Sequence, residues 1–174
     1  MKANPSVRQT EDREHVITRV FDTPRELVFK AWTDPRLVAE WWGPKCFTTP
    51  VCEMDVRPGG AYRIVMRSPD GVDYPLKGVY RDVRAPSLLV YTVDVSEHPA
   101  DWHQLLTEHL QGNEADTSQP VLHTITFEPE GSKTRLIVRS TFDSAVLRDA
   151  FVKMGMEEGW GQILDKLADL LSRS

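Results

Sequence analysis

The C-terminal stretch of residues 144–172 constrains the fold more than any other part of this 174-residue chain. Its apolar side chains recur at the spacing of a helix with one buried side, and charged side chains fall between them. The recurring residues are Leu147, Phe151, Met154, Trp160, Ile163, Leu164, Leu167, Leu170 and Leu171. Gly155, Gly159 and Gly161 each cost a helix interior about 0.5–1 kcal/mol relative to alanine, which predicts close packing or a bend there. We therefore expect a long C-terminal helix with a β-sheet wrapped around it.

Regularly spaced turns predict that this sheet is antiparallel. Four of the gaps between the β-rich runs are short turns, and two of these contain Pro-Gly or Asp-Gly, which join hairpins rather than crossover helices. The runs cover residues 14–21, 51–56, 61–67, 72–83, 88–95, 120–128 and 133–142. Pro75 lacks an N–H donor, so we expect it at a bulge or on an edge. The predicted fold class is α+β, with a long helix on a curved antiparallel sheet.

Two short helices are expected between the first strand and the second. Residues 23–26 (TPRE) match a capping box with proline at the first helical position. Asp34 and Pro35 begin the second helix, and the Gly-Pro pair at 43–44 ends it. Trp41 and Trp42 precede that end; we expect them to close the end of a cavity or of the core beneath the two short helices, and an exposed contact patch is the alternative.

Composition and charge exclude several classes of protein. The net charge of −5 argues against a non-specific nucleic-acid binder, which needs a basic face. No apolar run approaches the roughly 20 residues that span a bilayer, and the polar start lacks the apolar core of a secretion signal. We therefore expect a cytoplasmic protein with no membrane partner, in which Cys46 and Cys52 are free thiols.

The expected organisation is a flexible N-terminal tail, residues 1–12, followed by a single domain, residues 13–174. Residues 97–119 interrupt the strand pattern, with a short helix over 100–110 and then a polar loop. We interpret this segment as an insertion between strands and as a candidate lid, since loops of this length are often functional. The alternative is an ordinary surface excursion.

Four blocks of sequence resemble a known family. They read RVFDTPRELVFKAWTDPRLVAEWWGP, GGAYRIVMRSPDG, GVYRDVRAPSLLVYT and EEGWGQILDKLADLL, and the resemblance runs from about residue 16 to residue 171. They are similar to the Activator of Heat-shock-protein ATPase homologue family, within the START-like, polyketide-cyclase and pollen-allergen-like (SRPBCC) superfamily. The resemblance implies a helix-grip fold, in which the sheet curls around the C-terminal helix and leaves a deep cavity between them.

Alternation along the strands predicts which side chains face such a cavity. One face of the sheet is apolar with a few polar tips, whereas the other carries arginines. The predicted lining is Tyr62, Ile64, Met66, Tyr91, His123, Phe127, Met154 and Trp160. Ligand sites are mainly apolar with a few placed polar groups, which describes this set. The alternative for each residue is a packed core side chain whose polar tip bonds to the backbone.

No catalytic, metal or cofactor site is predicted. His123 is the best single candidate for acid–base chemistry, because the pKa of histidine lies near neutrality, but the sequence places no orienting partner beside it. Glu157 and Glu158 are adjacent in the sequence, and we expect them to lie on a solvated face of the helix, with one of them facing the cavity as the alternative. His103 and His109 are six apart, which separates them on a helix, and no phosphate-binding loop or dinucleotide fingerprint occurs.

The leading functional hypothesis is non-enzymatic binding of a small hydrophobic molecule between the sheet and the C-terminal helix, in a stress or resistance role. The first alternative, suggested by the family, is a co-chaperone that activates a heat-shock-protein ATPase. The second is a cyclase-like or hydrolase-like enzyme that uses His123. The expected partners are therefore a small apolar ligand and, in the first alternative, a chaperone; a homodimer is left open.

Overall fold

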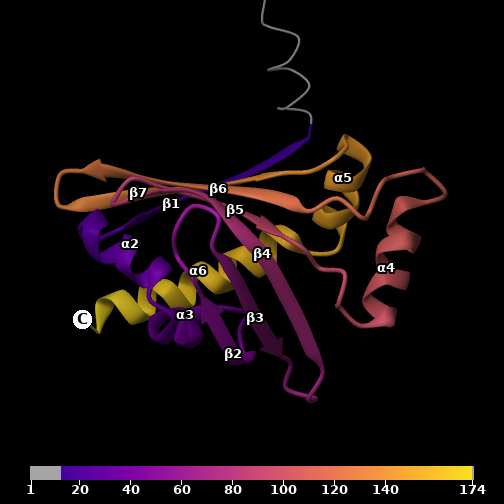
Figure 1. The fold of residues 1–174 in the computed structure, drawn as a ribbon, viewed down its shortest axis with the longest axis horizontal. Helices are drawn as coiled ribbons and strands as arrows, with labels where there is room; N and C mark the ends of the chain where they lie inside the picture. Colours follow the sequence, from indigo (N-terminus) through magenta and orange to yellow (C-terminus); the bar gives the residue numbers. More distant parts are fainter. Residues whose placement is uncertain (1–12, 174) are drawn as a thin grey trace, which may run out of the picture.

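The computed structural model describes residues 13–173 and shows a curved antiparallel sheet with helices on one face (Figure 1). The seven strands lie in the order β1-β7-β6-β5-β4-β3-β2. Their bounds are β1 Glu14–Phe21, β2 Thr48–Met54, β3 Ala61–Arg67, β4 Asp73–Arg84, β5 Leu88–Val93, β6 Val121–Glu130 and β7 Lys133–Thr141. The predicted tail, residues 1–12, lies outside the described residues.

The helices complete an α+β architecture and confirm the predicted fold class. Their bounds are α2 Arg25–Thr33, α3 Pro35–Trp41, α4 Ala100–Leu110, α5 Ala145–Lys153 and α6 Met156–Ser172. In Figure 1, α6 crosses the concave face of the sheet with α2 and α3 beside its C-terminal half, and α4 and α5 lie at the opposite end. The division into one domain with an insertion at 97–119 stays a prediction.

The C-terminal stretch is two helices rather than one. Gly155 has a φ of 92°, a left-handed conformation that residues with a side chain rarely adopt, and it separates α5 from α6. The predicted bend is therefore confirmed at Gly155. The alternative explanation, close packing, is wrong for Gly159 and Gly161, because a Cβ atom added at either would meet no atom within 4 Å.

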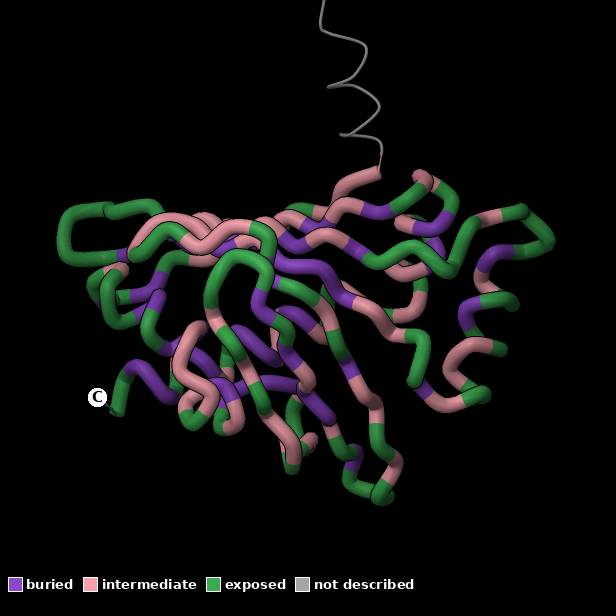
Figure 2. The backbone as a smooth tube through the Cα atoms, viewed as in Figure 1, coloured by how far each residue is buried: buried purple, intermediate pink, exposed green. Residues whose placement is uncertain are grey.

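The core lies between the inner face of the sheet and the helices α2, α3 and α6 (Figure 2). Paired residues on neighbouring strands form rows across the sheet. Leu89 pairs with Ile125, and Ile125 pairs with Val138; all three are buried. Trp41 is fully buried, and its indole nitrogen donates a 2.9 Å hydrogen bond to the carbonyl oxygen of Ala31. The prediction that Trp41 closes the core is therefore confirmed.

The capping box predicted at residues 23–26 is wrong. Helix α2 begins one residue later than the motif requires, with Pro24 as its N-cap and no side-chain cap. Thr134 on β7 fixes the backbone of Thr23 instead: the Thr134 hydroxyl donates a 2.6 Å hydrogen bond to the carbonyl oxygen of Thr23. A tertiary contact thus replaces the local cap. The predicted start of α3 at Asp34 and Pro35 is confirmed, because the Asp34 side chain caps the helix by accepting a hydrogen bond from the backbone amide of Arg36.

The segment between β5 and β6 forms α4 at the predicted bounds. Trp102 contacts Phe151 of α5 edge to face, with ring centroids 5.6 Å apart. Ahead of the helix, buried His98 donates from Nδ1 to the carbonyl oxygen of Pro75 over 2.9 Å. Pro75 itself lies beyond the last β4–β5 pairs, on the part of β4 that pairs only with β3, which confirms the edge prediction.

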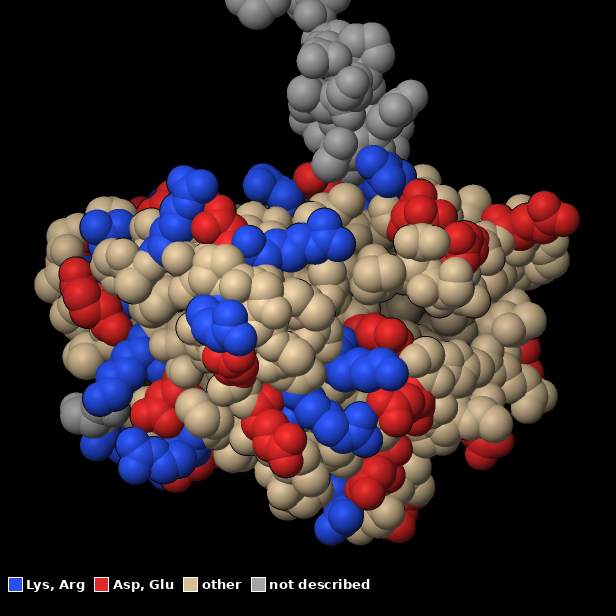
Figure 3. Space-filling view, viewed as in Figure 1, with Lys and Arg blue, Asp and Glu red and all other residues tan. Residues whose placement is uncertain are grey.

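The outer face of the sheet is charged and solvated, as predicted. Basic and acidic side chains are interspersed over the face that Figure 3 shows. The arginines of this surface pair with acids: Arg63 with Glu97, Arg67 with Asp73, Arg135 with Glu130 and Arg139 with Glu14. Within residues 13–173, no helix is long and apolar enough to cross a bilayer.

Candidate functional site

A cavity of about 160 Å³ lies between the N-terminal half of α6 and the inner face of the sheet. Its walls come from β3 to β6, from the chain after α3, and from the segment that runs through α5 into α6. The lining residues are Trp42, Met66, Leu76, Val93, Val95, Val121, His123, Phe142, Phe151, Met156, Trp160 and Ile163. Met66, Val95, Phe151 and Met156 are only half-buried, so the mouth of the cavity lies beside them.

The cavity brings together part of the predicted lining. Met66, His123 and Trp160 contribute to its walls. Tyr62, Ile64 and Tyr91 line a second, smaller space of about 20 Å³, deeper under the sheet. Trp42 lines both spaces and separates them.

The two remaining predicted residues border neither space. Phe127 is 1% exposed, and its ring packs edge to face on Phe29 with centroids 5.1 Å apart. Met154 is half-buried at the C-cap of α5, directly before the break at Gly155. Phe127 packs in the core between sheet and α2, and Met154 lies at the junction of the two C-terminal helices.

Sequence reasoning missed most of the cavity wall. Trp42 lines the cavity, in line with the expectation that it closes the end of a cavity or of the core, although it is not in the predicted lining set. Phe142, just after β7, and Phe151 of α5 are also outside that set; their ring centroids lie 5.0 Å apart. Phe151 did carry a signal, because it belongs to the helical apolar pattern of residues 144–172. That pattern identifies a buried side but not which of its residues borders empty space.

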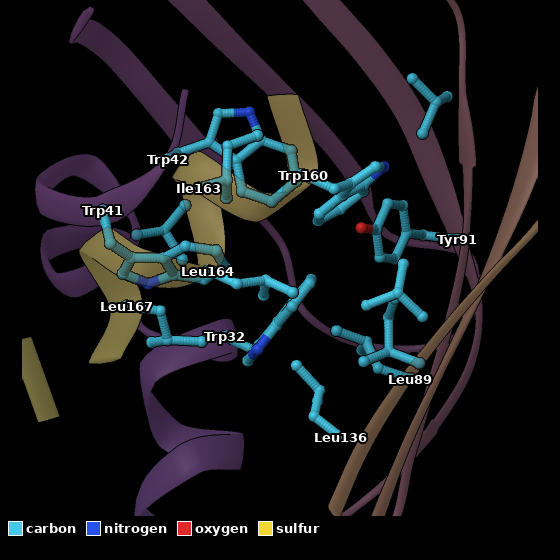
Figure 4. Close-up of a cluster of buried hydrophobic side chains, with 14 of the residues drawn as sticks. Trp32, Trp41, Trp42, Leu89, Tyr91, Leu136, Trp160, Ile163, Leu164 and Leu167 are labelled. Atoms are coloured by element: carbon cyan, nitrogen blue, oxygen red, sulfur yellow. The ribbon is translucent and has the colours of Figure 1, made fainter. Parts of the chain in front are cut away.

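His123 and Tyr91 form the polar element of the site. They are directly paired across β6 and β5, so both side chains project from the inner face. The Tyr91 hydroxyl lies 3.2 Å from Nδ1 of His123. Figure 4 shows that hydroxyl pointing from the sheet toward Trp160, whose ring centroid lies 5.5 Å from that of His123.

Burial keeps both groups neutral. It lowers the pKa of His123 to about 3 and raises the pKa of Tyr91 well above its ordinary value. At neutral pH the imidazole is therefore uncharged and a weak proton acceptor, and the phenol is not ionised. The pair can form hydrogen bonds but is poorly matched to proton transfer near pH 7.

Tyr62 is positioned by a close approach of backbone. Its hydroxyl donates a 2.5 Å hydrogen bond to the carbonyl oxygen of Thr92, across the intervening strand β4. The ring passes over Gly78, where an added Cβ would come within 2.8 Å of the ring and 1.9 Å of the Thr92 oxygen. Glycine at position 78 thus makes room for this hydrogen bond, and burial raises the pKa of Tyr62.

Within residues 13–173, no group of three or more His, Cys, Asp or Glu side chains has an arrangement that could hold a metal ion. The histidines of α4 and the segment before it make other contacts: His98 bonds to Pro75, and His103 packs on Trp102 with ring centroids 5.1 Å apart. Cys46 is exposed and Cys52 half-buried, and both are free thiols as predicted. Glu157 and Glu158 are exposed, which confirms the solvated face.

The comparison with protein families finds one match over most of the chain. The family model described as "Activator of Hsp90 ATPase homolog 1-like protein" matches residues 22–172. A comparison with curated proteins finds no match.

Solved structures share the fold over nearly their whole length. A protein from Nitrosomonas europaea has a TM-score of 0.75 and 25% identity, over 93% of this chain and 96% of its own. One from Arthrobacter aurescens has a TM-score of 0.75 and 25% identity, over 95% and 89%. One from Rhodobacter sphaeroides, 18% identical, has a TM-score of 0.76 over 93% of both chains. The helix-grip fold is thus common to this chain and to these proteins.

Proposed function

The chain belongs to the Activator of Hsp90 ATPase homolog 1-like family, and on that premise we propose that it binds one small apolar molecule in the cavity between α6 and the sheet. The family and the helix-grip fold support a ligand-binding or activator-like role in general terms. The choice of a small apolar molecule rests on the cavity itself. The proposed binding residues include Met66, His123 and Trp160 among the predicted set.

The composition of the wall is the observation that carries the proposal. Apart from His123, every lining side chain is aliphatic, aromatic or a thioether. An apolar cavity of about 150 Å³ in a protein core stays dry and accepts a benzene-sized guest. At about 160 Å³, this cavity has room for one ring with a small substituent.

Tyr62, Ile64 and Tyr91 have a supporting part in the proposal. They line the deeper space of about 20 Å³, which is too small for a ring. Trp42 forms the partition between the two spaces, so a movement of its indole would join them. Phe127 and Met154 border neither space and are left out of the proposed binding set.

Catalysis is not part of the proposal. A neutral His123 with a pKa of about 3 is a weak general base, and among residues 13–173 no Asp, Glu, Lys or Arg lines the cavity. The enzymatic alternative makes a distinct prediction: His123→Phe would abolish turnover of a substrate, whereas a binding protein with this substitution changes only its affinity.

Fluorescence of Trp160 provides the test. The chain has five tryptophans, so titrations of the natural protein with small aromatic molecules need a Trp160→Phe control to identify the responding ring. Binding is expected to alter the emission, and the response is expected to be lost or strongly reduced in Trp160→Phe. Absence of any response, by fluorescence and by calorimetry, across a broad panel of one-ring molecules would overturn the proposal.

The family description favours a second candidate, activation of a heat-shock ATPase. It predicts a direct complex with an Hsp90-type chaperone and a higher rate of ATP hydrolysis. To separate the two functions, the protein is added to the chaperone, and both complex formation and the rate of ATP hydrolysis are measured. Stimulation that persists when the cavity is blocked would favour the activator role over ligand binding.

A further inference from the structure

The hydrogen bond between Tyr91 and His123 has a defined direction. The Tyr91 hydroxyl is buried, and a buried hydroxyl proton requires an acceptor. Within residues 13–173, Nδ1 of His123 is the one hydrogen-bond partner of that hydroxyl. Tyr91 therefore donates to Nδ1, which acts as the acceptor nitrogen of the ring.

This direction places the imidazole proton on Nε2. A neutral imidazole carries one proton, and Nδ1 is occupied as an acceptor. The side chain of His123 is 7% exposed and lines the cavity. In the part of the chain that the structure describes, Nε2 makes no hydrogen bond, and it is not among the fully buried atoms that lack a partner, so it stays accessible as a donor at the cavity wall. The indole nitrogen of Trp42 is the other donor of the wall; it is buried and has no hydrogen-bond partner among the described residues.

The rest of the wall has no complementary acceptor. The other lining side chains are hydrocarbon, thioether or indole, and none carries an oxygen atom. An occupant with its own O–H or N–H would find no strong side-chain acceptor. A carboxylate would lose its hydration with no cation to pair with it, which is costly in an apolar site.

We propose that the cavity selects a neutral one-ring molecule with a carbonyl or ether oxygen, which accepts a hydrogen bond from Nε2 of His123 while the ring packs against Trp160. This inference rests on the proposed binding function and narrows its ligand class. It makes His123 a specificity-determining residue rather than a base, and it assigns Tyr91 the role of fixing the tautomer.

A pair of probes with the same shape tests the inference. Acetophenone and α-methylstyrene differ in that a carbonyl oxygen in the first is replaced by a CH₂ group in the second. A net hydrogen bond contributes about 0.5–1.5 kcal/mol, so calorimetry should give acetophenone an affinity about 2- to 13-fold higher. Benzoate, with the same ring and a charged carboxylate, is expected not to bind detectably.

Two variants test whether His123 causes the preference for acetophenone over α-methylstyrene. In His123→Phe, a flat ring without a donor, the two probes are expected to bind equally. In His109→Phe, on α4 and outside the cavity, the preference is expected to persist. Because His123→Phe also leaves the Tyr91 hydroxyl without its acceptor, a second measurement uses the unaltered protein. The ¹⁵N spectrum of the His123 ring should show a protonated Nε2, whose resonance shifts when acetophenone is added but not when α-methylstyrene is added.

The outcomes separate this inference from the function on which it rests. Equal affinities for acetophenone and α-methylstyrene in the natural protein, or tight binding of benzoate, would overturn the selection by Nε2 and leave apolar binding intact. A proton on Nδ1 would also overturn it. Failure of both neutral probes to bind would overturn this inference, and failure of the whole panel of one-ring molecules would overturn the proposed function as well.

Discussion

The ammonium nitrogen of Lys166 on α6 donates a 3.2 Å hydrogen bond to the carbonyl oxygen of Gly43, a residue 123 positions earlier in the chain. It also reaches the carbonyl oxygens of Trp42, at 3.2 Å, and Phe47, at 3.4 Å. Burial lowers the pKa of Lys166, so the ammonium group is partly removed from water. One charged side chain thus fixes the chain segment that carries Trp42, the partition between the two spaces.

Replacing Lys166 should loosen this segment. Lys166→Met keeps the aliphatic stem but removes the charged donor, and we expect it to lower the free energy of unfolding by about 1.5–3 kcal/mol, as for hydrogen bonds from a charged group. Urea denaturation measures the change. Lys153→Met, at an exposed lysine, is the matched control and should stay within about 0.5 kcal/mol of the natural protein. Equal effects of the two substitutions would show that the three carbonyl contacts contribute nothing.

The glycines near the break in the C-terminal stretch should respond in opposite directions to alanine. Gly155→Ala forces a left-handed φ on a residue with a Cβ atom, and we expect a loss of about 1–2 kcal/mol. Gly159→Ala lies inside α6 with open space around the added atom, and should gain about 0.5–1 kcal/mol. Thermal unfolding compares the two. A loss of stability in Gly159→Ala would reveal a packing role that the structure does not show.

His98 should make stability depend on acid pH. Burial, which outweighs the hydrogen bond to Pro75, lowers the pKa of His98 to about 4, and nearby His103 acts in the same direction. The unfolded chain, with a pKa near 6.5, takes up the proton first as the pH falls. The contribution of neutral His98 is therefore full above about pH 6.5 and is lost as the pH falls toward 4, by up to about 1.4 kcal/mol per pH unit.

His98→Gln isolates this effect, because an amide can still donate to the Pro75 carbonyl but does not titrate. The difference in stability between the natural protein and this variant should shift in favour of the variant between pH 6.5 and 4. His123 titrates in both proteins and cancels from the difference. A constant difference over this range would contradict a lowered pKa at His98.

Filling the mouth of the cavity should block the proposed ligand. Val95 is half-buried at the mouth, and in Val95→Phe the larger ring would occupy part of the space. We expect acetophenone binding to weaken by about tenfold or more, because steric overlap in a packed site costs about 1–3 kcal/mol. Val79→Phe makes the same chemical change at a valine that is 42% exposed and outside the cavity, and should leave binding unchanged. Unaltered affinity in Val95→Phe would place the ligand elsewhere.

Local patterns predict the elements of this fold well. The strands at 14–21 and 61–67 and the helix at 100–110 have the predicted bounds, because alternation, helical spacing and turn residues act over a few positions. The capping box failed where a distant residue intervened: the hydroxyl of Thr134 engages the Thr23 carbonyl, and the helix starts one residue later. Such a contact has no signature in the four residues of the motif.

The site was harder to predict than the fold, because a cavity is what remains after packing. Alternation along the strands identified the inner face correctly and so placed Met66 and His123 at the cavity, and helical spacing placed Trp160 there. The same alternation gives Phe127 an identical pattern, yet Phe29 of α2 fills the space in front of it. Which inward side chain is covered depends on the positions of α2 and α5, and those positions depend on long-range contacts.

The interruption at Gly155 has a mechanical consequence. Phe151 precedes it and Met156 follows it, and both belong to the rim of the compartment. The distal turns of α6 are anchored by Leu164 and Leu167, which are 1% and 0% exposed, so they stay fixed when the rim moves. The backbone conformation of this one residue therefore sets the relative placement of Phe151 and Met156 at the rim, while Arg148 of α5 ties that helix to β1 by donating to the Glu14 carbonyl oxygen.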